Sequence, residues 1–130
     1  ILNVKLNHIL SWTKKRQAIA NIYRQHLKEL PNISIPKVDK DCTHVFHLYV
    51  ILAEKRNELM SFLKDNGIGT ALHYPNILPL LECYDHLNHS ALDFPMGFDA
   101  SQRILSLPMF PELEEKEIQY VCQKIKEFYT

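Results

Sequence analysis

Apolar residues recur at helical spacing near both ends of the chain. In the opening part they fall mostly three or four positions apart, with lysines and arginines between them. This spacing predicts a long amphipathic helix over residues 2–30, ended by a proline that cannot continue it, and a closing helix over residues 114–129. The apolar positions are Leu2, Leu6, Ile9, Ile19, Tyr23, Leu27 and Leu30 in the first helix and Ile118, Val121, Cys122, Ile125 and Phe128 in the second.

Between these helices, short apolar runs alternate with turn residues. A run rich in β-branched and aromatic residues without a breaker indicates a mostly buried strand, and prolines end two further runs. We therefore expect strands at residues 33–35, 44–53, 69–74 and 104–107, helices at 54–66 and 95–103, and a stretch of mixed signals at 76–88. This order predicts an α/β fold of α+β-like character, in which helices pack on a small sheet of about three to four strands.

The length of 130 residues fits one domain. The predicted helix over residues 2–30, within the opening segment 1–30, would be about 43 Å long, which is more than a small domain needs for its own packing. We expect this helix to bridge to a larger N-terminal domain, while residues 31–130 form the small domain itself. The chain opens at Ile1, inside the amphipathic pattern and without an N-cap, so we expect it to be part of a longer polypeptide.

Composition narrows the class of protein. The formal net charge is zero, which argues against a general nucleic-acid binder. The first 28 residues carry only basic charges and the last twenty are rich in glutamate, a pattern typical of solvated helix faces. Cys42, Cys83 and Cys122 form no CxxC pair, so free thiols in a reducing compartment are expected. No apolar run approaches the roughly 20 residues of a membrane span, and we expect a cytoplasmic, soluble protein.

The strongest candidate for a binding site is the end of the run at residues 67–75. His73 and Tyr74 come directly before Pro75, which should stop the strand and leave both side chains at its rim. Such edges often present ligand contacts, and an imidazole and a phenol can both hydrogen-bond to oxygen atoms. The alternative is that the pair only covers the end of the core. We predict that both side chains face a domain interface.

Other polar residues give weaker signals. His44 and His47 would point to opposite faces of a strand, which is poor geometry for a shared metal ion, and the acidic and histidine residues at 85–89 are expected in a loop. Ser106 lacks the flanking glycines of a nucleophile elbow. With three glycines in all, the chain holds no glycine-rich phosphate loop. We therefore predict no metal site and no complete catalytic site in these residues.

Taken together, several runs resemble the C-terminal third of the DegT/DnrJ/EryC1/StrS aminotransferases. Their order and separations match over essentially the whole chain. The matching features are residues 44–51, 67–75 and 104–113, the opening helix with Trp12 and Arg16, and the closing helix to Phe128.

The resemblance implies the small domain of a fold-type I enzyme. In that family a lysine of the large domain binds pyridoxal 5'-phosphate, and an amino group passes, usually from L-glutamate, to a nucleotide-linked keto sugar for cell-surface polysaccharide or related glycan biosynthesis. The family also implies a homodimer. None of the lysines in this chain matches the cofactor lysine, so this polypeptide alone should neither bind the cofactor specifically nor transaminate.

The resemblance also assigns substrate binding. His73 and Tyr74 match family positions that border the sugar-nucleotide site. The family commonly continues with Pro-Leu-His and then a Gln, whereas this chain has Ile77, Pro79 and Leu81 in that stretch, which implies altered substrate recognition. Two alternatives stay open: a dehydratase of the same family, in which histidine replaces the cofactor lysine, and a free-standing non-catalytic ligand-binding or interaction domain.

Overall fold

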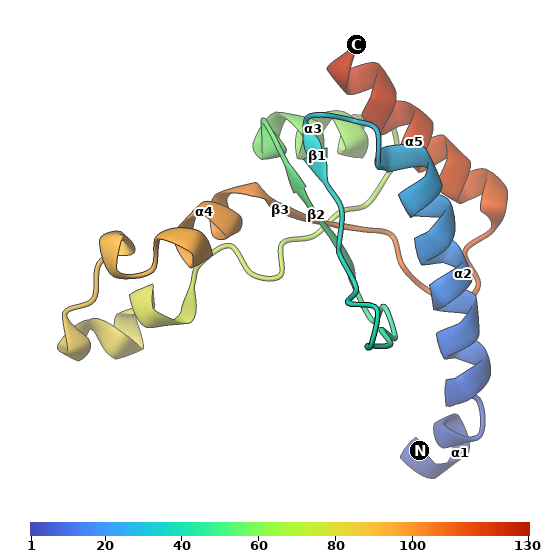
Figure 1. The fold of residues 1–130 in the computed structure, drawn as a ribbon, viewed down its shortest axis with the longest axis horizontal. Helices are drawn as coiled ribbons and strands as arrows, with labels where there is room; N and C mark the ends of the chain where they lie inside the picture. Colours follow the sequence, from blue (N-terminus) through green and yellow to red (C-terminus); the bar gives the residue numbers. More distant parts are fainter.

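The computed structural model describes all residues, 1–130. Helices surround a small central sheet, and one long segment extends away from the rest (Figure 1). None of the helices is both long and apolar enough to cross a bilayer. The elements are α1 (Leu2–Leu6), α2 (Ile9–Leu27), β1 (Ile33–Ser34), β2 (Tyr49–Ala53), α3 (Arg56–Asp65), α4 (Pro95–Arg103), β3 (Ile104–Leu107) and α5 (Glu115–Tyr129), with 3-10 helices η1 (Leu78–Leu80), η2 (Glu82–Leu87) and η3 (Ala91–Asp93).

The sheet has three antiparallel strands in the order β1-β2-β3. Side chains alternate across β2, so Tyr49, Ile51 and Ala53 are buried while the two residues between them are half-buried. Ile51 pairs with Leu105 of β3, which is also buried. One face of the sheet therefore carries the core, and the opposite face remains partly open. The predicted α+β arrangement of helices on a small sheet is confirmed.

The core lies between the buried sheet face and helices α2, α3 and α5. Helices α2 and α5 run side by side (Figure 1), and α3 packs against α5. The Tyr23 ring of α2 stacks on Tyr49 with centroids 4.9 Å apart, and its hydroxyl donates a hydrogen bond of 2.9 Å to the carbonyl of Pro108. These contacts fix α2 and the strand ends relative to each other.

The prediction of one continuous helix over residues 2–30 is wrong. The helix breaks at Asn7 and His8 into α1 and α2, and α2 ends at Leu27, with a turn before Pro31. Asn and His are weak helix formers, and no residue before Ile19 is buried, so tertiary packing does not hold the first turns in line. Ser11 Oγ donates to the carbonyl of His8 at 2.8 Å, close to the start of the second helix.

Three predicted strands are shorter than expected, and the one at residues 33–35 forms only over Ile33–Ser34 as β1. Residues 44–48 lie outside β2 because Phe46 adopts φ +49°, a left-handed conformation that a strand does not accommodate. Pairing with β3 starts at Tyr49 opposite Leu107, and Pro108 then offers no N–H to extend it. Of residues 69–74, only Ala71 joins the sheet, in an isolated bridge to Ser106. Helix 54–66 appears as α3, and the expected helices at 95–103 and 114–129 and the strand at 104–107 are confirmed.

The long segment that extends from the sheet, here called the arm, comprises residues 69–100. No residue in it is buried. It contains η1, η2, η3 and most of α4, joined by short turns, and in Figure 1 it reaches away from α2 and α5. The mixed signals at residues 76–88 therefore correspond to 3-10 turns rather than to a regular helix. Leu78, Leu92 and Met96 expose most of their surfaces in the arm.

Candidate functional site

The candidate site begins where α3 ends. Gly67 takes φ +75°, which glycine adopts without strain, and its N–H donates to the carbonyl of Lys64. Ile68 is buried and its N–H reaches the carbonyl of Leu63, so the chain leaves α3 in a fixed direction. Ala71 then exchanges two backbone hydrogen bonds with Ser106, of 3.2 and 2.8 Å. This single bridge attaches the start of the arm to β3.

His73 and Tyr74 follow the bridge by two and three residues. His73 is half-buried, and its Nδ1 lies 2.9 Å from Ser106 Oγ. Tyr74 is 73% exposed, and its ring meets the His73 ring edge to face at 5.6 Å. The two side chains thus lie together at the rim of the sheet and not in its core. That they face a domain interface stays a prediction.

A small cavity of about 330 Å³ adjoins Tyr74. Its other walls come from Pro75, Asn76, Leu78 and Leu81. Leu81 stands where the family resemblance predicts glutamine, so this wall offers an apolar surface in place of an amide. The cavity thus has the Tyr74 ring on one wall and the aliphatic side chains of Leu78 and Leu81 on others, while His73 contacts Tyr74 from outside the cavity lining.

Ser106 is the neighbour of the candidate site that the sequence reasoning missed. It is 4% exposed in the middle of β3, and its side chain reaches His73 across the bridge. A signal for it exists in the sequence, because a small polar residue stands between Leu105 and Leu107 in a strand that is otherwise apolar. Buried hydroxyls nearly always have a hydrogen-bond partner, so this position calls for a polar neighbour, either a backbone group or a side chain.

The remaining histidine candidates do not converge. His44 lies in the loop before β2, where its Nδ1 accepts a hydrogen bond of 2.9 Å from the N–H of Phe46. The prediction that it shares a strand with His47 is wrong, for the reason given above for Phe46. His89 packs edge to face on Phe94 at 5.1 Å. No group of three or more His, Cys, Asp or Glu side chains is arranged to hold a metal ion.

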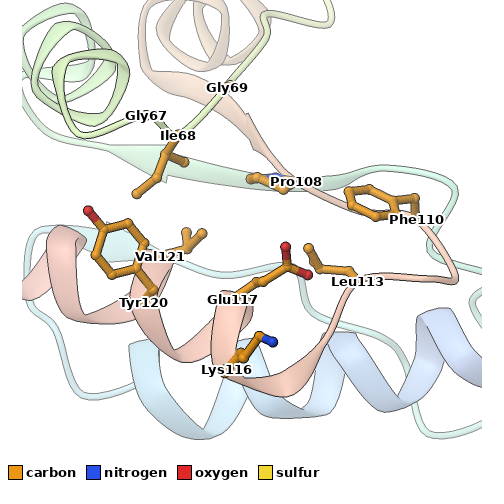
Figure 2. Close-up of a pocket in the computed structure, with 10 residues that line it drawn as sticks. All are labelled: Gly67, Ile68, Gly69, Pro108, Phe110, Leu113, Lys116, Glu117, Tyr120 and Val121. Carbon is orange, nitrogen blue, oxygen red and sulfur yellow. The ribbon is translucent and has the colours of Figure 1, made fainter.

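A second surface cavity, of about 410 Å³, lies between the exit from α3, the loop after β3 and α5 (Figure 2). Its polar side chains already have partners within the chain. Glu117 accepts from the N–H of Glu114, the Lys116 ammonium lies 2.6 Å from the Glu114 carboxylate, and Tyr120 donates to the carbonyl of Asn66. The cavity contains neither His73 nor Tyr74, and it is separate from the candidate site.

Comparison with known proteins decides the family. Residues 1–126 match the model of the DegT/DnrJ/EryC1/StrS aminotransferase family. The chain belongs to this family. The resemblance inferred from the sequence motifs is therefore confirmed.

Individual DegT/DnrJ/EryC1/StrS relatives agree. A pleiotropic regulatory protein of Geobacillus stearothermophilus is 43% identical over 99% of this chain. A dTDP-3-amino-3,4,6-trideoxy-alpha-D-glucose transaminase of Streptomyces venezuelae is 33% identical over 98%. The crystal structure of S. venezuelae DesV in complex with a ketimine intermediate superposes with a TM-score of 0.94 at 33% identity and covers 98% of this chain. The chain spans about a third of the length of these relatives, 34–35%.

The residues of this chain do not fit the cofactor of the family. A lysine that forms a Schiff base is usually desolvated in a pocket or placed beside another cation, which lowers its pKa. Ten of the eleven lysines here are exposed, and the eleventh, Lys124, is half-buried and pairs with Glu127 at 2.7 Å. Hydrogen bonding to Glu127 raises the pKa of Lys124, which is opposite to what a nucleophilic amine needs.

Proposed function

We propose that this chain provides the nucleotide-sugar-binding small domain of a pyridoxal-phosphate-dependent aminotransferase. The complete enzyme would transfer an amino group from L-glutamate to a keto sugar carried on a nucleoside diphosphate, for glycan biosynthesis in the cytoplasm. The cofactor and its lysine would belong to the larger part of the enzyme, which is joined through α1 and α2. Two copies of the enzyme would form a homodimer.

Family membership over residues 1–126 carries this proposal. Several relatives that align with nearly the whole chain are named as transaminases of nucleotide-linked amino sugars, among them the S. venezuelae enzyme. Two features of the chain add support. The His73–Tyr74 pair lies at an accessible rim, and the exposed apolar residues of α1, α2 and the arm offer surfaces for a larger domain.

The proposed roles of the two residues are specific. The Tyr74 hydroxyl would donate to a diphosphate or sugar oxygen, and the His73 imidazole would hydrogen-bond to a neighbouring oxygen. Neither residue would act on the amino donor. The apolar wall formed by Leu78 and Leu81 would favour a sugar that presents a deoxy or methyl group there, since an aliphatic surface does not satisfy hydroxyls.

The test separates the two halves of the reaction in the full-length enzyme. His73→Ala and Tyr74→Phe should each weaken use of the nucleotide sugar about tenfold or more, because each removes a hydrogen bond to a charged or strongly polar group worth about 1.5–3 kcal/mol. The half-reaction with glutamate should stay near the wild-type rate. Stopped-flow measurement of both half-reactions checks this. An equal fall in both, or no fall in either, would contradict the assignment.

A second candidate is a binding domain without catalysis, and the name of the 43% identical relative, a pleiotropic regulatory protein, is the observation that favours it. In that case the full-length protein would bind a nucleotide sugar but would not use glutamate. Mass spectrometry of the products formed from a nucleotide-linked keto sugar, glutamate and added cofactor separates the two candidates.

A further inference from the structure

Ser106 forms the backbone bridge that joins the start of the arm to the sheet. Its N–H and carbonyl both bond to Ala71, and it also lies opposite Val50 of β2. The side chains of Ala71, His73 and Ser106 share the less buried face of the sheet, because side chains two residues apart along an extended segment point the same way. His73 is the diagonal neighbour of Ser106 on that face, and its imidazole is long enough to span the diagonal and meet the serine hydroxyl.

The burial of the Ser106 hydroxyl and its single partner together determine the direction of its hydrogen bond. His73 Nδ1, at 2.9 Å, is its one partner in the chain. If Nδ1 carried the proton and donated to Oγ, the buried hydroxyl hydrogen of Ser106 would have no acceptor, which is unfavourable. The hydroxyl therefore donates to Nδ1, and the neutral ring carries its proton on Nε2.

The Nε2 atom of His73 is the free end of this pair. It makes no hydrogen bond within the chain and is not among the buried polar atoms that lack a partner, so it reaches solvent. As an N–H group it donates a hydrogen bond without carrying a positive charge. A ligand that meets it must present an oxygen acceptor.

We propose that Ser106 is a positioning residue for sugar-nucleotide recognition: it holds neutral His73 in the Nε2–H form, ready to donate to an oxygen acceptor of the ligand. The acceptor class is a phosphate oxygen or a sugar carbonyl or ether oxygen. The ligand named in this inference rests on the proposed function. The hydrogen bond by which Ser106 orients His73 is a property of this chain alone.

The first experiment measures the ring directly. Two-bond proton–nitrogen NMR correlation of the nitrogen-15-labelled 130-residue chain, at a pH where imidazole is neutral, reports which nitrogen carries the proton. His73→Ala assigns the signal among the seven histidines. We expect the Nε2–H form in the wild type and in Ser106→Thr, and a changed Nδ1 shift with mixed forms in Ser106→Ala. An Nδ1–H form in the wild type, or an unchanged ring in Ser106→Ala, would overturn the proposal.

A matched control exists in the chain. Ser101 of α4 is also 4% exposed, but its hydroxyl donates to the carbonyl of Phe98 at 2.7 Å and does not contact His73. Ser101→Ala removes an equally buried hydroxyl and should leave the His73 signals unchanged. If it changes them as much as Ser106→Ala does, the effect is a general loss of packing and the positioning role is wrong.

The second experiment uses the full-length enzyme. Ser106→Ala should raise KM for the nucleotide sugar about fivefold, as expected for one lost neutral hydrogen bond, and Ser106→Thr should restore it. The double variant with His73→Ala should be no worse than His73→Ala alone, because Ser106 acts through that ring. Additive effects would refute the positioning role. If His73→Ala itself has no effect, the proposed function fails, and the NMR experiment still decides whether Ser106 sets the form of the ring.

Discussion

At the scale of single residues, the three cysteines have different surroundings. Cys42 and Cys83 are exposed, whereas Cys122 lies in the core on α5. Burial raises the pKa of the Cys122 thiol to about 12, and the positive charge of Lys126 opposes this only in part. A thiol must lose its proton to react with electrophiles, so burial and the raised pKa both protect Cys122.

The expected result is selective labelling. At pH 8, iodoacetamide should modify Cys42 and Cys83 in the native chain, and Cys122 only after unfolding, as peptide mass spectrometry would show. Cys122 labelling at the same rate as Cys83 would mean that α5 does not pack as described.

The same group makes stability depend on pH. Because the pKa of Cys122 in the folded chain lies above the ordinary thiol value of 9.0, the contribution of its burial to stability is fully present below about pH 9 and is lost as pH rises towards 12. Burial raises the pKa of Tyr49 to about 12 as well, from 10.0, and so acts in the same direction. Ionisation of either group at alkaline pH therefore destabilises the core.

Residue-scale predictions from the sequence succeeded where a local pattern decides the outcome. His73 and Tyr74 lie at the rim, as the sequence predicted, although the pairing already ends at Ala71 and not at Pro75. The Ser106 contact did not, because it joins residues 33 positions apart and depends on which strand the arm meets. The family match supplied the role of the pair, and this role stays a prediction until the half-reactions are measured.

At the scale of elements, helices were predicted better than strands. The apolar stripes that predict α3, α4 and α5 are local sequence patterns. Helix α3 ends just before a glycine, α4 ends where β3 begins, and α5 ends at the last residues of the chain. The limits of β2 depend on its neighbours, since a strand extends only as far as another strand pairs with it. β3 pairs with β2 over four residues, and this limit is invisible in the apolar run at residues 44–53.

The link between α2 and the end of β3 gives a test at this scale. Tyr23→Phe removes the hydrogen bond to Pro108 but keeps the stacked ring, so it should lower the free energy of unfolding by about 1 kcal/mol, and by up to about 3 if the carbonyl is left buried without a partner. Urea unfolding measures this.

Tyr84→Phe is the control for this experiment, because Tyr84 is 40% exposed in the arm and its hydroxyl has no partner in the chain. It should leave stability nearly unchanged. Equal effects of the two substitutions would show that the Tyr23 bond contributes nothing specific.

At the scale of the whole molecule, the layered arrangement was predicted but the exposed surfaces were predicted only in part. The apolar stripe of the opening helix was expected, and Leu2, Leu6 and Leu10 are 80, 66 and 77% exposed. The arm was not expected to lack buried residues along its whole length. None of the residues in its turns is buried. The spacing of apolar residues cannot show that a segment lies away from the core.

Such a stripe should cause the chain to self-associate, because contiguous apolar patches rarely stay exposed to water. Sedimentation velocity over rising concentration should show dimers or larger species. Leu6→Lys combined with Leu10→Lys should shift the chain towards monomer. Leu78→Lys combined with Leu92→Lys, a matched double change of two exposed leucines in the arm, should not. A wild-type chain that stays strictly monomeric at high concentration would contradict this.

The arm has a consequence for how the chain is held together. The residues before it supply α2, β2 and α3, and those after it supply β3 and α5, while the arm contributes no buried side chain. The core contacts between the residues before the arm and those after it therefore do not require the arm to be an unbroken chain. We expect the two peptides made by a protease cut between η2 and η3 to stay associated through β2–β3 pairing and α2–α5 packing, because these contacts join residues on both sides of the cut.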